Sequence, residues 1–267
     1  MTLTVTITNS IISFAFFEGE RALPPMLRIA AAPARTADEY AALLHAMPLP
    51  QQMQPVKVAA IASVVPLLTP ELCRTVHLLY PDAICLTVGA GLKTGLTIHT
   101  DHPAEVGADL VAMAVGATTL HKPPFLVLNL GDVTTLSAVL EEKGTPVYHG
   151  CAILPGAKLS ATALKQEAAL LSTVELAPPT HAIGKNTADS VRAGLLLGLS
   201  AAIERLCTAF EAETGVKMPL IATGEEAELI LPLLERTAIY DGTLAHKGLA
   251  HLALRNAKKA GNPAKRV

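Results

Sequence analysis

Two short turns, each directly after an apolar strand, are the best placed residues in this sequence for chemistry on a phosphate. The first turn is Thr8-Asn9-Ser10, after a strand predicted at Leu3–Ile7. The second begins at Gly131-Asp132, after a strand predicted at Phe125–Leu130. A tight turn after a buried strand can present several backbone N–H groups to a phosphate. The pattern therefore indicates two candidate phosphate-binding turns, with ordinary β-hairpins as the alternative.

The cysteines and histidines do not have the spacing of a metal site. The four cysteines lie far apart and form neither a CxxC pair nor a zinc-finger pattern, so we expect reduced, buried thiols. Among the nine histidines, His99 and His102 are the closest pair, and His246 and His251 do not share a helical face. We therefore predict no metal site from these residues. The cysteines are Cys73, Cys85, Cys151 and Cys207.

The elements that must position the two turns repeat along the chain. Each half opens with strand, turn, strand, turn and strand, and helices follow; further strands are predicted only in the first half. This repeat predicts an α/β protein with two similar halves that face each other across a cleft. The strands are expected at Leu3–Ile7, Ile11–Phe17, Leu27–Ala31, Val56–Val65, Ala83–Val88, Phe125–Leu130, Val133–Leu140 and Val147–Leu154.

Helices are expected between and after these strands. A capping box at Thr36–Glu39 and an N-cap at Thr69 before Pro70 mark the first two helix starts. The expected helices are Thr36–Ala46, Thr69–Tyr80, Glu105–Leu120, Ser160–Leu171, Thr187–Glu213, Glu225–Glu235 and Thr243–Lys259.

Composition excludes several classes of protein. The chain has 267 residues, of which 51% are hydrophobic and 16% charged, so it can bury a large core and is neither disordered nor a disulfide scaffold. A net charge of -2 argues against a nucleic-acid partner. The longest apolar runs, Val58–Leu68 and Ala193–Ile203, fall short of the roughly 18 residues that a membrane span needs. Since the first basic residue is Arg21, no signal peptide is indicated, and we expect a cytoplasmic protein.

Eight short motifs, in order and near the expected spacing, resemble those of the type III pantothenate kinase family. Two of them are the most specific: Pro103-Ala-Glu-Val-Gly-Ala-Asp109 and Ile183-Gly-Lys-Asn-Thr187. The others are Arg35-Thr-Ala-Asp-Glu-Tyr40, Ser63-Val-Val-Pro66 with Thr69-Pro70, Lys93-Thr-Gly95, Ala152-Ile153 with Pro155-Gly156, Val174-Glu-Leu176 and Ala222-Thr-Gly224.

The resemblance implies a fold, a reaction and partners. The implied fold is that of acetate and sugar kinases, Hsc70 and actin, with two ribonuclease-H-like domains, at 1–120 and 121–267, closing on a nucleotide. The implied reaction is phosphorylation of pantothenate by ATP, the first step towards coenzyme A, with Mg²⁺ and a monovalent cation such as K⁺ or NH₄⁺. The implied assembly is a dimer in which the partner subunit completes each pantothenate pocket.

The resemblance also assigns roles to individual residues. Asp109 matches the catalytic base, and its alternative is a surface carboxylate on a helix. Thr187 matches a pantothenate contact, and its alternative is a helix N-cap. Gly107 and Ala108 belong to the substrate site. The nucleotide-binding positions are Asn9, Ser10, Gly131, Thr134, Thr135 and Gly224.

Several departures from the family pattern fall on the reaction centre. Thr6 and Asn129 stand where the family has carboxylates that position cations, so no metal ligand is assigned in this chain. Thr8 replaces a glycine whose backbone approaches phosphate, and Asp132 replaces a threonine that faces ATP. On the substrate side, Leu110, Thr100, His102 and Glu225 replace an arginine, a tyrosine, an asparagine and a glycine.

Three functions remain open from the sequence. The favoured hypothesis is a kinase subunit with an impaired nucleotide site that completes the site of an intact partner in a heterodimer. A second is a self-sufficient, divergent homodimeric kinase, in which Glu225, Asp132 or Asp101 could replace the carboxylate missing at Thr6. The third is a non-catalytic protein that binds a ligand or regulates a partner, a pseudokinase.

Overall fold

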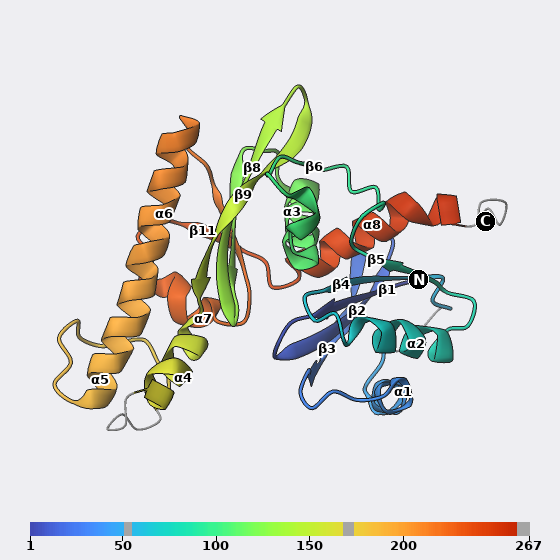
Figure 1. Ribbon diagram of the computed structural model, residues 1–267, viewed down its shortest axis with the longest axis horizontal. Helices are drawn as coiled ribbons and strands as arrows, with labels where there is room; N and C mark the ends of the chain where they lie inside the picture. Colours follow the sequence, from blue (N-terminus) through green and yellow to red (C-terminus); the bar gives the residue numbers. More distant parts are fainter. Residues whose placement is uncertain (51–54, 168–173, 261–267) are drawn as a thin grey trace. The chain divides into compact units, whose positions relative to one another are not determined.

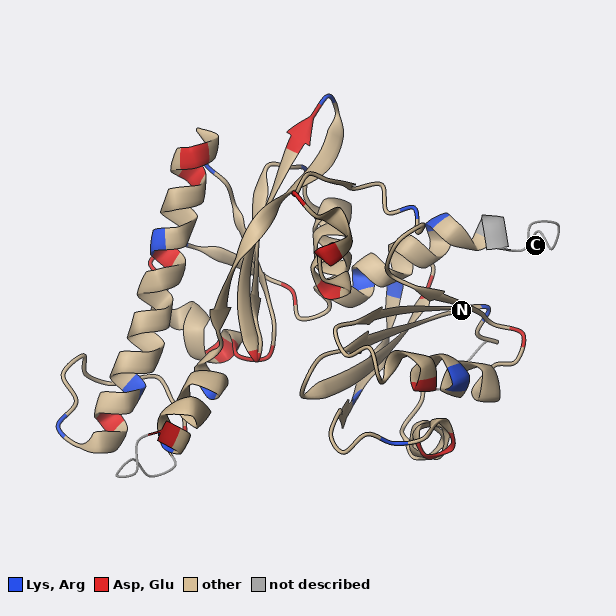
Figure 2. Ribbon diagram, viewed as in Figure 1, with Lys and Arg blue, Asp and Glu red and all other residues tan. Residues whose placement is uncertain are grey.

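The computed structural model describes residues 1–50, 55–167 and 174–260 of the chain (Figure 1). These residues form two compact units: Met1–His121 together with the chain from Thr243 onward, and Lys122–Gly242. Each unit is an α/β arrangement with a mixed sheet and flanking helices. Strands β1, β4 and β7 carry no charged residue, and charge gathers on helices and loops (Figure 2).

The sheet of the first unit has the strand order β3-β2-β1-β4-β5. β1, β2 and β3 form an antiparallel meander, and β4 and β5 continue parallel to β1. The carboxyl ends of three parallel strands therefore meet at one edge of the sheet, where α/β proteins commonly place their sites. The strands are β1 (Thr2–Ile7), β2 (Ile11–Glu18), β3 (Arg21–Ala30), β4 (Val58–Ser63) and β5 (Ile84–Thr87).

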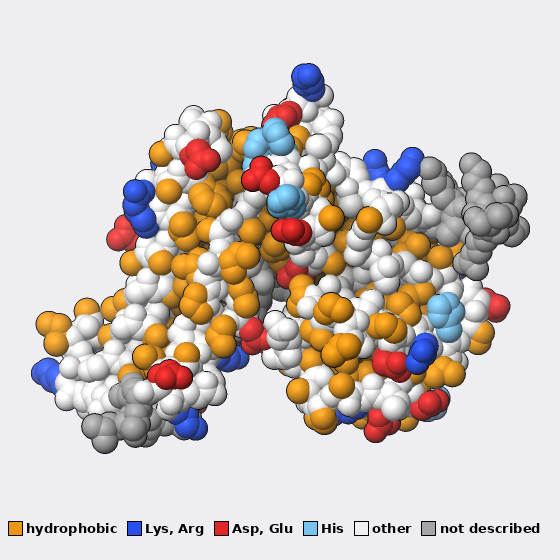
Figure 3. Space-filling model, viewed as in Figure 1, with side chains coloured by type: hydrophobic (Ala, Val, Ile, Leu, Met, Phe, Trp, Pro, Cys, Tyr) orange, Lys and Arg blue, Asp and Glu red, His pale blue; other side chains and the backbone are white. Residues whose placement is uncertain are grey.

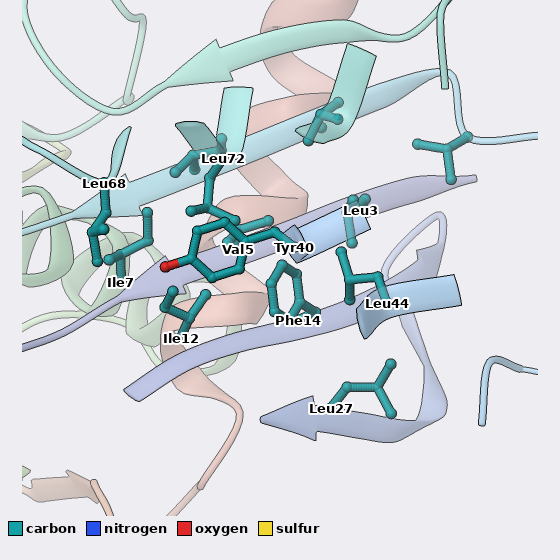
Figure 4. Close-up of a cluster of buried hydrophobic side chains, with 14 of the residues drawn as sticks. Leu3, Val5, Ile7, Ile12, Phe14, Leu27, Tyr40, Leu44, Leu68 and Leu72 are labelled. Carbon is teal, nitrogen blue, oxygen red and sulfur yellow. The ribbon is translucent and has the colours of Figure 1, made fainter. Parts of the chain in front are cut away.

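Alternation along β1 and β2 decides what each face of this sheet packs against. Leu3, Val5 and Ile7 point to a core covered by α1 (Ala37–Ala46) and α2 (Thr69–Leu79), as Figure 4 shows. Tyr40 of α1 is fully buried in this core. The other face of β1 carries threonines, and α8 (Leu244–Ala260) packs there.

The second unit repeats the same sheet. Its strands run in the order β9-β8-β7-β10-β11, with an antiparallel meander followed by two strands parallel to β7. The predicted pair of strand–turn–strand–turn–strand openings is therefore present. The prediction missed the two parallel strands β10 and β11, because they are only four and three residues long. The strands are β7 (Phe125–Leu130), β8 (Val133–Glu142), β9 (Thr145–Pro155), β10 (Leu220–Thr223) and β11 (Ala238–Tyr240).

The C-terminal helix belongs to the first unit, which differs from the predicted domain 121–267. Helix α8 packs along α3 (Ala108–Leu120), and glycines on both helices allow a very close approach. A β-carbon on Gly248 would lie 1.9 Å from the Ala112 carbonyl oxygen. A β-carbon on Gly116 would lie 2.1 Å from the Leu244 carbonyl oxygen. This contact between distant segments has no local sequence pattern.

Several predicted helix boundaries are corrected by the structure. The helix expected from Glu105 starts at Ala108, after a 3₁₀ turn η1 (Pro103–Glu105), because Val106 is extended. The N-cap of α2 is Leu68 rather than Thr69, whose hydroxyl instead donates to the Val65 carbonyl. The capping box at α1 is present. A short strand β6 (Thr97–Ile98) precedes η1.

The helices of the second unit also differ in detail from the prediction. Helix α4 (Ala157–Glu167) starts three residues early, and residues 168–171 of its predicted range lie outside the described residues. The expected helix Glu225–Glu235 is only α7 (Ala227–Ile230) and the turn η3 (Leu231–Leu233), since Pro232 cannot continue a helix. The helix predicted from Thr187 consists of α5 (Thr187–Arg192), a π turn η2 (Ala193–Leu197) and α6 (Gly198–Thr214).

The stretch Thr187–Thr214 is long and apolar enough to cross a membrane by length and composition alone. Its Leu196, Ile203 and Cys207 are instead buried in the core of the second unit, against strands β7, β8 and β10. Apolar side chains on this helix are therefore accounted for by the protein core.

Candidate active site

The first turn lies at the carboxyl edge of the first sheet and is closed by Thr8. The Thr8 amide donates to the Ile11 carbonyl at 2.9 Å, and the Thr8 hydroxyl accepts from the Ile11 amide at 3.0 Å. Asn9 and Ser10 between them are exposed. Thr8 has no positive φ, so the expected backbone strain at this position is absent. The threonine instead holds the Ile11 N–H group, which is then unavailable to a phosphate.

Thr6 ends a chain of side-chain hydrogen bonds that reaches helix α8. Its hydroxyl lies 2.5 Å from that of Ser13, the residue opposite it on β2. Ser13 Oγ lies 2.9 Å from His246 Nε2, and Thr4 Oγ1 lies 2.8 Å from His246 Nδ1. Sequence reasoning missed this contact, because His246 is more than 230 positions away.

The donor in each of these hydrogen bonds can be assigned by starting at Thr4, the other end of the series. The Thr4 hydroxyl donates to the Ala15 carbonyl, so it accepts the proton of His246 Nδ1. His246 Nε2 is then an acceptor, and Ser13 donates to it. Ser13 in turn accepts from Thr6. The Thr6 hydroxyl proton is therefore committed to Ser13, and only Thr6 lone pairs remain for another group.

We expect His246 to make the protein less stable as the pH falls. Burial, and secondarily the charge of Arg28, lowers the pKa of His246 from 6.5 to about 4. Between these values the unfolded chain binds the proton and the folded chain does not, so the free energy of unfolding decreases as pH falls through this window. The decrease from this residue should reach about 3 kcal/mol near pH 4. Urea unfolding between about pH 4 and 7 measures it.

A His246→Gln variant is the control for this pH dependence. The glutamine amide can donate hydrogen bonds and accept them, but it does not titrate in this range. Its stability should fall less steeply than that of the wild type in acid. Equal slopes for the two proteins would contradict the assignment to His246.

Asp109 lies in the first turn of α3, which packs beside β4. A β-carbon on Gly107 would lie 2.5 Å from Asp109 Oδ1, so the carboxylate folds back over this glycine. Burial raises the pKa of Asp109, and the backbone amides of Leu110 and of Asp109 itself partly oppose the rise. A carboxylate of this kind is suited to accept a proton. Gly107 is the N-cap and Ala108 the first residue of the helix.

The second turn is packed tightly between two glycines. A β-carbon on Gly156 would lie 2.1 Å from the Gly131 carbonyl oxygen. Gly224 has a φ of +106°, and its β-carbon would lie 2.2 Å from the Leu130 carbonyl oxygen. Because β7 and β10 run parallel with Asn129 opposite Thr223, the segments after both strands meet at one edge. The structure thus brings Gly131 and Gly224 to the same edge of the sheet.

Sequence reasoning missed Glu226, a buried carboxylate at this edge. Its side chain is 1% exposed, and its two oxygens accept from the amides of Ala157 at 2.7 Å and Lys158 at 3.0 Å. Its own amide donates to the Leu130 carbonyl at 2.8 Å. Glu226 therefore ties the start of α4 to the second turn. The local sequence gave one sign of this contact, which is that α4 begins without a capping side chain of its own.

The polar residues on β7 and β8 lie opposite one another in the sheet. Asn129 pairs with Thr135, and Leu130 pairs with Thr134. Thr134 is fully buried, and its hydroxyl has no hydrogen-bond partner among the described residues. Thr135 is also buried, whereas Asn129 and Asp132 are half-buried. Among the residues predicted for nucleotide binding, Asn9 and Ser10 are therefore exposed, Thr134 and Thr135 are buried, and the two glycines are half-buried.

The side-chain oxygens of Thr6 and Asn129 do not fit Mg²⁺. Mg²⁺ in proteins is bound through carboxylates and substrate phosphates. Thr6 and Asn129 supply a hydroxyl and an amide where the family has carboxylates. The hydroxyl proton of Thr6 already points to Ser13. Asp132, Glu225 and Glu226 are carboxylates near the second turn, and the two oxygens of Glu226 are engaged by the amides of α4.

The segment Ile183–Thr187 is shaped by a glycine and directs its other residues outward. A β-carbon on Gly184 would lie 2.3 Å from the Ser190 amide nitrogen, so this residue must be glycine. Ile183 is 81% exposed, and Thr187 is exposed at the start of α5. The helix N-cap is Asn186, which accepts from the Asp189 amide at 2.9 Å, so capping does not explain Thr187. Hydrophobic side chains lie at the surface around α5 (Figure 3).

The repeated sheet and the turns at its carboxyl edges define an α/β protein of the actin-like ATPase fold. Solved structures with this fold include the activator of 2-hydroxyisocaproyl-CoA dehydratase from Clostridium difficile, at TM-score 0.54 and 11% identity, covering 100% of this chain and 98% of that one. Component A of (R)-2-hydroxyglutaryl-CoA dehydratase from Acidaminococcus fermentans gives TM-score 0.52 at 12% identity, covering 98% and 99%.

The chain belongs to the type III pantothenate kinase family. The sequence model of that family matches residues 2–209. A type III pantothenate kinase from Myxococcus xanthus is 36% identical over 258 residues, which cover 96% of this chain and 99% of the relative. A second, from Roseiflexus sp., is 37% identical over 254 residues, covering 93% and 96%.

Proposed function

We propose that this chain is a cytoplasmic pantothenate kinase subunit that takes part in the phosphorylation of pantothenate by ATP. In this proposal its own nucleotide site is impaired, and it acts as a heterodimer with an intact homologue whose pantothenate site it completes. ATP, Mg²⁺ and the monovalent cation are then bound by the intact chain. Membership of the family supports the reaction, because relatives described as type III pantothenate kinases align with nearly the whole chain.

The observation that carries the proposal is the exposed segment Ile183–Thr187. Ile183 leaves 81% of its surface exposed, so the motif is accessible to another chain. The neighbouring Thr187 presents its hydroxyl at the same surface. By resemblance, this threonine contacts pantothenate across the subunit boundary. The motif is intact here although the nucleotide turns are not.

The first turn supports the impaired nucleotide site. Thr8 holds the Ile11 amide, and Thr6 offers no carboxylate and commits its proton to Ser13. At the second turn, Asp132 adds a negative charge where a threonine is expected to face ATP. These changes are independent and all disfavour a bound triphosphate and its metal.

One observation favours a self-sufficient homodimeric kinase instead. Asp109 is half-buried at the start of α3 with a raised pKa, so the proton-accepting group of the reaction is intact. In that case Asp109 takes the proton from the substrate hydroxyl while the hydroxyl oxygen attacks the terminal phosphorus of ATP, and the bond to the leaving ADP breaks. An assay of the purified chain with pantothenate, ATP, Mg²⁺ and K⁺ tests this alternative.

Mixing the chain with its intact homologue tests the main proposal. The same genome should encode a second family member that retains the Asp-x-Gly-Asn-Thr turn. Each protein is purified alone, and pantothenate-dependent ADP formation is measured for each and for the mixture. We expect the mixture to exceed the sum of the separate rates. A mixture no faster than the homologue alone would refute the shared site.

Calorimetry that detects pantothenate binding to this chain alone, without activity in any mixture, would instead indicate a ligand-binding pseudokinase.

Thr187→Val in this chain should reduce the stimulation of the homologue by about fivefold to a hundredfold, since a lost hydrogen bond to substrate costs about 1–3 kcal/mol. The loss should appear mainly as a higher KM for pantothenate. Thr187→Ser, which keeps the hydroxyl, should retain most of the stimulation. Thr208→Val, at an exposed threonine on α6, is the matched control and should behave as the wild type. Equal behaviour of Thr187→Val and Thr208→Val would remove Thr187 from the site.

A further inference from the structure

Two cysteines of the first unit lie in direct contact although they come from different elements. Cys73 is on helix α2 and Cys85 is on β5, the edge strand of the sheet. Their sulfur atoms are 3.5 Å apart, and the Cys85 thiol donates to Cys73 Sγ. Both residues are free thiols and partly exposed. A disulfide needs a sulfur separation near 2.05 Å, so closing the pair requires a side-chain movement of about 1.5 Å.

We propose that Cys73 and Cys85 form a dithiol modification site that a low-molecular-weight disulfide, such as oxidised glutathione, closes to an intramolecular disulfide. This site is independent of the kinase function proposed above. It would join α2 to β5, the strand that leads into the Gly89–Gly91 turn.

The geometry assigns a different part to each sulfur. Cys73 accepts the hydrogen bond, so its thiolate is the attacking group. The hydrogen bond from Cys85 lowers the pKa of Cys73 to about 7. The same contact raises the pKa of Cys85, which stays protonated while Cys73 is a thiolate.

The reaction balances in two exchanges. The Cys73 thiolate attacks one sulfur of the oxidant, whose S–S bond breaks and releases one thiolate that takes up a proton. Cys73 is then a mixed disulfide and no longer holds Cys85 protonated through its charge. Cys85 loses its proton to water, attacks Cys73 Sγ and expels the second thiol. The protein has lost two electrons and two protons, and the oxidant has become two thiols.

The other two cysteines provide internal controls. Cys207 is buried in the second unit, and burial raises its pKa to about 11, so it should not react. Cys151 is partly exposed on β9 and has no cysteine neighbour among the described residues, so it should form at most a mixed disulfide.

Peptide mapping after incubation in a glutathione redox buffer tests the site. Trypsin cuts after Arg74, between the two cysteines, so the disulfide links the peptide 58–74 to the peptide 75–93. The full chain is equilibrated over a series of glutathione ratios, free thiols are alkylated, and the digest is analysed by mass spectrometry. We expect the linked peptides at ratios at which the peptide 144–158, which contains Cys151, is still mostly alkylated.

Two variants distinguish an internal disulfide from general oxidation. Cys85→Ser should stop the reaction at a glutathione adduct on Cys73, and Cys73→Ser should leave Cys85 alkylated. The wild-type map decides the question even if a variant folds poorly, and circular dichroism reports folding. Linked peptides absent at every ratio, or formed only when Cys151 is also fully modified, would overturn the proposal.

Discussion

Removing the negative charge of Asp132 should raise the affinity of this chain for ATP by as much as roughly a thousandfold. Asp132 follows Gly131 in the second turn, at the position where the resemblance predicts a threonine that faces ATP. A carboxylate about 4 Å from a phosphate charge costs roughly 4 kcal/mol at an effective dielectric constant near 20. Asp132→Asn should give most of the gain, and Asp132→Thr should add a hydroxyl donor. Calorimetric titration with ATP measures both dissociation constants.

A matched variant separates a local effect from a change in net charge. Glu213→Gln removes one negative charge from the exposed end of α6, away from the turn in the same unit, and should leave ATP binding unchanged. The gain for Asp132→Asn should also shrink as salt is added, because ions screen half-exposed charges. If neither Asp132 variant binds ATP more tightly than Glu213→Gln does, Asp132 does not face the nucleotide.

Gly248→Ala should destabilise the protein by about 3 kcal/mol or more, and lower its Tm by roughly 10 °C. The new β-carbon would meet the Ala112 carbonyl oxygen at 1.9 Å, and this backbone atom of α3 cannot rotate away. Helices α3 and α8 must therefore separate. Because α8 carries His246, the separation would also disturb its hydrogen bonds to Thr4 and Ser13. Thermal and urea unfolding measure the loss.

Gly198→Ala is the control for this substitution. Gly198 begins α6, and a β-carbon there would have no atom within 4 Å. Alanine is the better helix former, so this variant should be as stable as the wild type or gain up to about 1 kcal/mol. Gly116→Ala, on the facing helix, should resemble Gly248→Ala. A wild-type melting curve for Gly248→Ala would show that the two helices are not in close contact.

Much of the fold could be predicted because it depends on local patterns. The alternation of apolar residues and threonines places β1, and the largely apolar run Phe125–Leu130 coincides with β7. The Thr36–Glu39 capping box marks α1. The short strands β10 and β11 could not be predicted, because a few residues do not display a period and their strand form depends on pairing with β7.

The candidate site could be predicted only as separate pieces. Motifs named Gly131, Gly224 and Asp109 as candidates, and the structure places the two glycines at one edge and Asp109 in the first turn of α3. They gave no indication that Glu226 binds the first amides of α4 or that Ser13 takes the Thr6 proton. Neither partnership leaves a pattern, since side-chain hydrogen bonds between distant segments have no fixed spacing.

The sequence by itself indicated the family, the repeated meanders and the positions at which the two turns depart from the motifs that it resembles, because motifs and strand alternation are properties of neighbouring residues. Tertiary structure alone decided that the helix from Leu244 returns to the first unit. It also decided that Cys73 touches Cys85 and that His246 bonds Thr4 and Ser13. The physical reason is that close packing between distant segments depends on backbone approach, as at Gly116 and Gly248, and not on any local period.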